Sequence, residues 1–251
     1  MTIRTYAASL AVVAALGMSG LKPAGAVELT VFLNQATESG VRELAKGFEQ
    51  ATGNKVNVVF KAGAELNKAI TSGEPGDLTS GGAGLDEYVK TGKVVQVVDY
   101  ARVANGAAVK EGGKKYDIST VAKLKDALLE AKTIGHSNAG TGPFNTRMFQ
   151  KMGIYDQIKD KIRITMGGKL VAQALIDGDF EFGIQQTNVI QPFPGTIYLG
   201  PLPDELLEYA TSSVGLLAVS KHPEEAKAFM KYMADPANAG LLRKGAMFPL
   251  S

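Results

Sequence analysis

Residues 28–60 decide the fold, and they read ELTVFLNQATESGVRELAKGFEQATGNKVNVVF. A β-prone apolar run over residues 28–33 predicts a buried strand. Apolar residues then recur at helical spacing from Val41 to Phe48, before a turn signal and a second β-prone run over residues 55–60. A strand, a helix and a strand in this order predict a βαβ unit, which belongs to a parallel sheet.

The same alternation of strands and helices continues through two blocks of the chain. The first block closes near residue 95, and the second begins near Val103. The β-prone run from Tyr209 to Ser220 is predicted to be a strand that crosses between the blocks, and Pro223 begins an amphipathic helix. We therefore predict a doubly wound α/β architecture.

The first residues predict an exported protein. Arg4 precedes a short apolar run over residues 7–18, and the small residues Ala-Gly-Ala follow at positions 24–26. A basic start, an apolar stretch and a site of small residues are typical of a secretory signal peptide, whereas a bilayer span needs about 20 residues. We predict that residues 1–26 are the signal peptide, with cleavage after Ala26. The alternative is a buried N-terminal helix.

Charge and composition exclude several classes of function. The full chain has 27 basic and 25 acidic residues, and Arg4 and Lys22 leave with the predicted signal peptide, so the mature chain is close to neutral. It has no basic run, which argues against a nucleic-acid partner. The absence of cysteine excludes disulfides, a thiolate metal site and a lipid-anchoring N-terminal cysteine. We expect a periplasmic monomer with no metal and no cofactor.

Small and polar residues follow the predicted strands. Open parallel sheets bind ligands at the carboxyl ends of their strands, so these residues form a candidate ligand site. They are Asn34, Thr37, Ala62, Gly63, Ser80, Asn138, Thr141, Gln185 and Gln186. Several are equally suited to capping a helix or to a solvated loop. They include no nucleophile with a base and no carboxylate pair, so we predict a binding protein without catalytic residues.

Several segments carry a resemblance to a known family. They are residues 29–60, 73–78 (GEPGDL), 86–94 (DEYVKTGKV), 178–184 (GDFEFGI) and 223–229 (PEEAKAF). In this order they resemble the molybdate-type solute-binding proteins of ABC transporters, extracellular type II, over essentially the whole mature chain. Residues 117–120, 183–186 and 200–203 look like a divergent subgroup of this family.

The resemblance implies a fold, a domain organisation and a partner. The fold is the two-lobed α/β fold of type II periplasmic binding proteins, in which each lobe is a mainly parallel sheet flanked by helices and crossing strands form the hinge. Lobe I is expected to comprise residues 27–102 plus 214–251, and lobe II residues 103–213. The implied partners are a small-molecule ligand, bound in the cleft between the lobes, and an ABC transporter permease in the inner membrane.

The chain departs from this family where the family binds its ligand. Serine hydroxyls of the family correspond to Ala36 and to Ala62 with Gly63, and a family tyrosine corresponds to Gln186. A backbone donor of the family falls near Gly168, which joins the candidate site residues. A missing hydrogen bond to a charged group costs about 1.5–3 kcal/mol. We therefore expect an organic acid or polar metabolite rather than molybdate.

Three alternatives remain open. Backbone donors can still bind an oxyanion such as molybdate. A membrane sensor can take the place of the importer, because the same fold and cleft serve both partners. An enzyme on the same scaffold is the third alternative, and product formation from a bound ligand would distinguish it.

Overall fold

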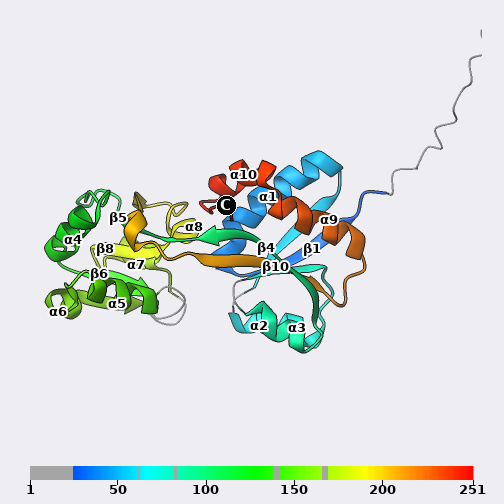
Figure 1. Ribbon diagram of the computed structural model, residues 1–251, viewed down its shortest axis with the longest axis horizontal. Helices are drawn as coiled ribbons and strands as arrows, with labels where there is room; N and C mark the ends of the chain where they lie inside the picture. The colour runs from blue at the N-terminus through cyan, green and yellow to red at the C-terminus, as the bar shows by residue number, and fades with distance from the viewer. Residues whose placement is uncertain (1–24, 62, 82–83, 138–141, 166–168, 251) are drawn as a thin grey trace, which may run out of the picture.

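The computed structural model describes residues 25–61, 63–81, 84–137, 142–165 and 169–250. These residues form two lobes that lie side by side and are joined by long strands (Figure 1). Most of the predicted signal peptide, residues 1–24, lies outside the described part of the chain.

The first lobe is built on a five-stranded sheet with the strand order β2-β1-β3-β10-β4. Its strands are β1 (Glu28–Leu33), β2 (Lys55–Phe60), β3 (Leu78–Gly81), β4 (Val94–Val103) and β10 (Ala210–Leu217). Its helices are α1 (Gln35–Thr52), α2 (Gly63–Ser72), α3 (Leu85–Lys90), α9 (Pro223–Ala234) and α10 (Ala239–Lys244). β1 pairs with β2 in parallel across α1, which confirms the predicted βαβ unit.

Helix α1 packs on this sheet because its apolar residues repeat along one face. Val41, Leu44 and Phe48 are buried there, and the rings of Phe48 and Phe229 have centroids 4.9 Å apart. Burial of each large apolar side chain contributes about 1.5–3 kcal/mol. The helix ends at Gly53, whose φ of 78° is a left-handed conformation that glycine adopts without a steric penalty.

The second lobe is built on a five-stranded sheet with the order β7-β6-β8-β5-β9. Its strands are β5 (Asn105–Lys110), β6 (Ile134–Ser137), β7 (Ile162–Thr165), β8 (Phe182–Gln186) and β9 (Thr196–Pro201). Its helices are α4 (Val121–Glu130), α5 (Gly142–Lys151), α6 (Tyr155–Ile158), α7 (Val171–Asp177) and α8 (Thr187–Ile190). Short 3-10 turns lie at Lys159–Lys161, Asp204–Leu206 and Pro236–Asn238.

Helices cover both faces of the second sheet. Phe182 and Ile184 of β8 belong to a buried cluster with residues of α4, α5 and α6, whereas Ala108 of β5 is buried with α7 on the other face. Helix α4 begins after Thr120, whose hydroxyl accepts a hydrogen bond from the Lys123 amide at 3.3 Å. This geometry makes Thr120 the N-cap residue of α4.

The two-lobed α/β fold is confirmed, but the sheets are mixed rather than mainly parallel. In the first sheet, β10 is antiparallel to β3 and β4, and in the second, β5 is antiparallel to β8 and β9. The remaining strand pairs are parallel. Each antiparallel pair contains β10 or β5, which are the strands that the chain enters after it crosses between the lobes. An antiparallel pair needs no crossover helix between its strands.

The chain crosses between the sheets at Val103 and Ala210, which are register partners. β4 ends at Val103, and Ala104 alone separates it from β5 of the second sheet. On the return, the chain leaves β9 and enters β10 at Ala210. The expected lobe limits of 102/103 and 213/214 stay predictions, and the second of them falls inside β10.

Candidate ligand-binding cleft

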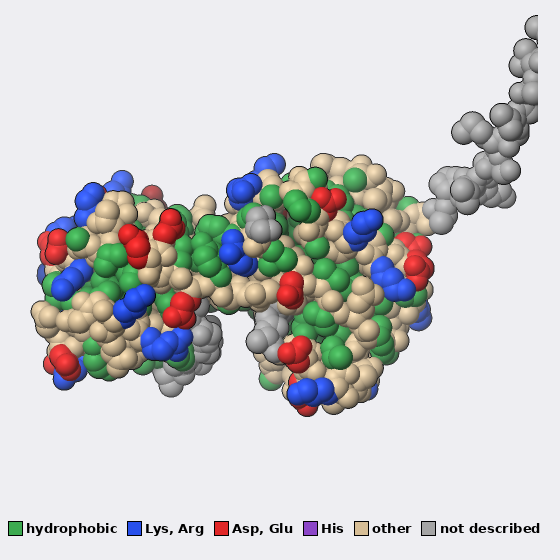
Figure 2. Space-filling model, viewed as in Figure 1, with side chains coloured by type: hydrophobic (Ala, Val, Ile, Leu, Met, Phe, Trp, Pro, Cys, Tyr) green, Lys and Arg blue, Asp and Glu red, His purple; other side chains and the backbone are tan. Residues whose placement is uncertain are grey.

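In each sheet, the carboxyl ends of the parallel strands lie next to the strands that cross between the lobes. In the first sheet, Ser213 pairs with Gly81 at the end of β3, and Ala210 of the same strand pairs with Val103. In the second sheet, Asn105 pairs with Gln186 at the end of β8. The space-filling view shows a notch between the two lobes beside these strands (Figure 2). We call this notch the cleft, because open α/β sheets bind ligands at strand carboxyl ends.

The described residues include part of the predicted site. Asn34, Thr37, Gly63 and Ser80 lie at strand ends of the first lobe, and Gln185 and Gln186 lie at the end of β8 in the second. Ala62, Asn138, Thr141 and Gly168 lie outside the described residues. The role of the whole set stays a prediction.

Asn34 and Thr37 stand where β1 passes into α1. The Asn34 side chain occupies the N-cap position without capping the helix, and its Oδ1 is buried with no hydrogen-bond partner in the described part of the chain. Thr37 is 1 % exposed, and its hydroxyl donates to the Asn34 carbonyl at 3.3 Å. The Thr37 hydroxyl therefore stabilises the start of α1, which leaves Asn34 as the polar side chain with unused capacity at this point.

Ser80 belongs to a buried hydrogen-bond network in the first lobe, at the end of β3. It is fully buried, and its hydroxyl lies 3.0 Å from the Tyr100 hydroxyl and 3.3 Å from the Ser213 carbonyl. Burial raises the pKa of Tyr100, and the hydrogen bond from Ser80 opposes that rise. Tyr100 thus remains a neutral phenol, and the network stiffens the end of β3.

The end of β2 offers one exposed glycine and one paired cation. Gly63 begins α2 and is exposed, with open space where a Cβ would lie. Lys61 forms an ion pair with Glu74 at 2.9 Å and lies over the Phe32 ring, 5.0 Å from its centroid. The Lys61 charge is therefore already balanced by a protein carboxylate.

A polar row lines the second lobe at the ends of three adjacent strands. Ser137 of β6 pairs with Thr165 of β7, and Gln185 lies two residues beyond the Gly135–Gly183 pair of β6 and β8. Side chains two residues apart share a face of a strand, so these three lie on the α7 face of the sheet. Thr165 Oγ1 and Gln185 Oε1 are buried and have no hydrogen-bond partner among the residues that the structure describes.

Thr165 is a candidate that sequence reasoning missed. Thr165 is the last residue of β7, and no local pattern distinguishes it from any other threonine. Only its pairing with Ser137, 28 residues earlier in the sequence, places it beside Gln185.

A second group of polar side chains lies on the opposite face of the same sheet. Asn105 of β5 donates through Nδ2 to Asn145 Oδ1 of α5 at 3.0 Å, and both residues are almost completely buried. This bond leaves one amide nitrogen and one amide oxygen without partners. His136 Nδ1 lies 2.8 Å from the Ser137 carbonyl, which only accepts, so the neutral ring carries its hydrogen on Nδ1. Its buried Nε2 has no partner.

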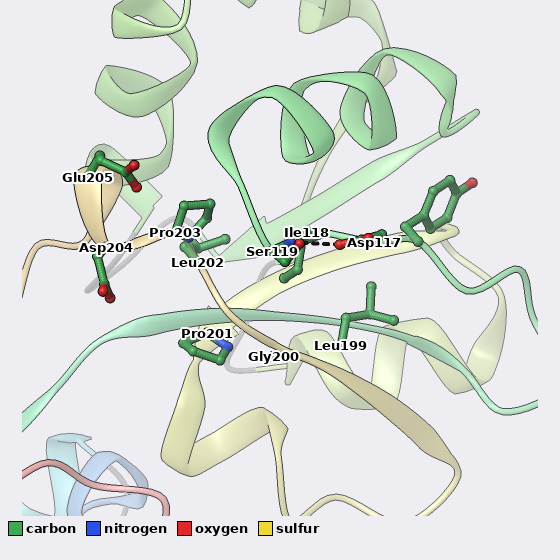
Figure 3. Close-up of a pocket in the computed structure, with 11 residues that line it drawn as sticks. Asp117, Ile118, Ser119, Leu199, Gly200, Pro201, Leu202, Pro203, Asp204 and Glu205 are labelled. Atoms are coloured by element: carbon green, nitrogen blue, oxygen red, sulfur yellow. Dashed lines mark hydrogen bonds between the residues drawn. The ribbon is translucent and has the colours of Figure 1, made fainter.

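The second lobe also carries a groove of about 500 Å³ outside the cleft. Residues 116–119 form one side, and residues 199–205 at the end of β9 form the other (Figure 3). Asp117 accepts a hydrogen bond from the Ser119 amide at 2.9 Å and pairs with Lys123 at 2.7 Å. These contacts lower the pKa of Asp117, the Lys123 bond most of all. The groove is open and lies away from the strand ends that hold the predicted site residues, so it is not the candidate site.

Within the described residues, no group of three or more His, Cys, Asp and Glu side chains is arranged to hold a metal ion. None of the helices in that part of the chain is both long and apolar enough to span a membrane.

Two mixed sheets, a double crossing and polar strand ends around a cleft define a two-lobed α/β binding protein. The sequence profile of the bacterial extracellular solute-binding proteins matches residues 29–245. The chain therefore belongs to the bacterial extracellular solute-binding protein family.

Three known proteins resemble the chain over most of its length. An aconitate isomerase from Pseudomonas sp. is 26% identical over 231 residues, which are 88% of this chain and 88% of that protein. The periplasmic molybdate-binding protein of Azotobacter vinelandii has a TM-score of 0.67 and 15% identity, and covers 89% of this chain and 100% of its own. PEB3 bound to L-phospholactate has a TM-score of 0.66 and 14% identity, with 88% and 99% covered. The two structures confirm the fold.

Proposed function

We propose that this protein is a periplasmic receptor that binds a small organic acid or polar metabolite in the cleft and delivers it to an ABC importer. The observation that carries the proposal is the chemistry of the strand ends. Gln185 Oε1, Thr165 Oγ1 and Asn34 Oδ1 are buried without partners among the described residues, while the Ser80 hydroxyl is hydrogen-bonded to Tyr100.

Amides and hydroxyls suit an organic ligand better than a bare oxyanion. An oxyanion only accepts hydrogen bonds, whereas an amide presents an accepting oxygen beside its donating nitrogen. A ligand with both donor and acceptor groups, such as a hydroxy acid, can satisfy both ends of Gln185 and Asn34, whereas an ionised carboxylate accepts hydrogen bonds from their nitrogens only. The alternative, an oxyanion held by backbone donors, leaves these amide oxygens without a partner, which costs about 1–3 kcal/mol for each buried group.

Two relatives support the organic-acid class. The Pseudomonas relative carries aconitate in its name, and the PEB3 structure contains L-phospholactate. Both compounds are small organic acids. Molybdate, in the name of the Azotobacter protein, is the contrasting class.

A ligand panel tests the proposal. The purified protein is heated with cis-aconitate, trans-aconitate, phospholactate, molybdate or sulfate, and unfolding is followed by circular dichroism. A ligand at a hundredfold excess over its Kd stabilises a protein by about 2.7 kcal/mol. We expect at least one organic acid to raise Tm while molybdate and sulfate do not. A response to molybdate alone would establish the oxyanion alternative.

An isomerase is the second candidate, because the relative named aconitate isomerase matches 88% of the chain. Isomerisation by proton transfer requires a base at the ligand, and His136 Nε2 is a buried ring nitrogen at this end of the second sheet with no hydrogen-bond partner among the described residues. Proton NMR of a cis-aconitate solution with the protein distinguishes the two candidates. Binding without conversion supports the receptor, whereas conversion that His136→Asn abolishes establishes the enzyme.

Export and the partner are tested separately. N-terminal sequencing of the protein from a periplasmic extract should begin at Val27. Cross-linking in intact cells should capture a transporter permease, whereas capture of a membrane sensor kinase would assign the protein to signalling.

A further inference from the structure

Helix α8 joins the second lobe to the first beside the crossing at Ala104, whose carbonyl accepts a hydrogen bond from the Thr187 amide at 2.9 Å. It comprises Thr187–Ile190 and follows directly on Gln185 and Gln186. All four of its residues are buried, with exposed fractions between 0 and 7 %. Figure 1 shows α8 between the two lobes, beside α1 and α10.

Side-chain hydrogen bonds connect α8 to the first lobe. The Thr187 hydroxyl donates to the Ala246 carbonyl at 2.9 Å, and Asn188 Nδ2 donates to the Ala36 carbonyl. The Ser39 hydroxyl of α1 lies 3.2 Å from the Asn188 carbonyl and 2.7 Å from the Gly245 carbonyl. We call Ser39, Thr187 and Asn188 the clasp.

Close packing in the first lobe supports the clasp from behind. A Cβ on Gly245 would lie 2.5 Å from the Gly40 Cα, so α1 and the turn after α10 touch backbone to backbone. Ala246 has a φ of 56°, a left-handed conformation that costs a residue other than glycine about 1 kcal/mol or more. This turn presents the carbonyls of Gly245 and Ala246 to the clasp. A strained and tightly packed turn is a rigid support for its partners.

The clasp also links two of the predicted ligand-lining segments. Asn188 lies two residues after Gln186, and its partner Ala36 lies between Asn34 and Thr37. The spacing between these segments of opposite lobes is therefore set by hydrogen bonds as well as by the crossing strands.

We propose that Ser39, Thr187 and Asn188 are positioning residues that fix the orientation of the two lobes in the unliganded protein and hold the ligand-lining segments at their binding distance. Two crossing strands by themselves leave the lobes able to twist about them. A third connection at α8 removes this freedom. The second half of the proposal rests on the proposed function, whereas the first half does not.

Distance measurements between spin labels test the clasp. The chain has no native cysteine, so Lys68→Cys on α2 and Gln150→Cys on α5, both exposed, take one label each. The clasp variant combines Ser39→Ala with Thr187→Val, which removes the hydroxyls with little change of shape. We expect double electron–electron resonance to give a broader distribution of label-to-label distances for the unliganded clasp variant than for the unliganded parent. An unchanged distribution overturns the proposal.

A matched control and a conservative variant separate positioning from general damage. Ser72→Ala with Thr71→Val removes two hydroxyls that donate to carbonyls within α2, and it should leave the distribution unchanged. Thr187→Ser keeps the hydroxyl and should behave like the parent. If the clasp variant unfolds, Asn188→Ala alone provides the same test, and a normal distribution for it together with normal affinity overturns the proposal.

Ligand affinity separates this proposal from the function. If the parent binds trans-aconitate, the clasp variant should bind it about tenfold more weakly, the change that ~1.4 kcal/mol produces. If the parent binds no compound of the panel, the proposed function fails, and the label distances of the unliganded protein still decide the clasp. A broader distribution with unchanged affinity refutes the positioning role.

Discussion

Replacement of Gln185 by alanine separates a ligand-binding side chain from a structural one. Gln185 Oε1 is buried and has no partner in the part of the protein that the structure describes, so its removal takes no hydrogen bond from that part of the unliganded fold. Gln185→Ala should therefore change the free energy of unfolding by less than about 1 kcal/mol. If Gln185 had a structural role, its removal would leave a buried hydrogen-bonding group of the protein without a partner, and this would lower the free energy of unfolding by about 1–3 kcal/mol.

The effect on affinity follows from the hydrogen bond that the ligand would lose. A neutral bond contributes about 0.5–1.5 kcal/mol and one to a carboxylate about 1.5–3 kcal/mol, which correspond to losses of roughly 2- to 12-fold and 12- to 150-fold in Kd. Isothermal titration calorimetry with the best organic acid of the panel measures this ratio, and urea unfolding measures stability on the same samples.

Gln157→Ala is the matched control for this experiment. Gln157 lies on α6, is exposed, and donates weakly to the Gly153 carbonyl at 3.4 Å. Its replacement should change neither the Kd for the organic acid nor the free energy of unfolding. The reasoning is refuted if Gln185→Ala keeps the parental Kd, or if it destabilises the protein without a change in Kd.

Three further predictions concern the scaffold. Tyr100→Phe should cost about 1 kcal/mol of stability at neutral pH through the lost bond to Ser80. Because the pKa of Tyr100 is raised in the folded state, parental stability should be complete below the unfolded pKa of about 10 and fall as pH rises above it, and Tyr100→Phe should weaken that fall in urea titrations at alkaline pH. Phe48→Ala should cost about 3–5 kcal/mol in the same assay, because the ring is buried against Phe229. Thr120→Ala should cost about 1 kcal/mol through loss of the α4 cap, and a neutral result would remove its capping role.

The order of strands and helices could be predicted because periodicity and turn residues are local signals. Residues 28–60 carry one complete βαβ unit, and Thr120 and Pro223 mark helix starts that the structure contains. The mixed character of the sheets could not be predicted in this way. Whether a strand returns antiparallel depends on which neighbour it meets, and β10 meets β3 and β4 from far along the chain.

The sequence predicts the candidate site residues that directly follow an apolar strand. It does not predict those that join the site only through pairing or packing between elements. Asn34, Gln185 and Gln186 follow apolar runs directly, and this pattern is visible in the sequence. The partner that occupies the Ser80 hydroxyl is Tyr100, which comes from another strand. Thr165 and the buried Asn105–Asn145 pair likewise depend on contacts between elements that no local pattern specifies.

A crystal structure of the protein with the organic acid that stabilises it most tests the central claim most directly. The account predicts ligand density between the lobes, with atoms within hydrogen-bonding distance of Gln185 and of Asn34 on the facing wall. Density in the groove between residues 116–119 and 199–205, with an empty cleft, would contradict it.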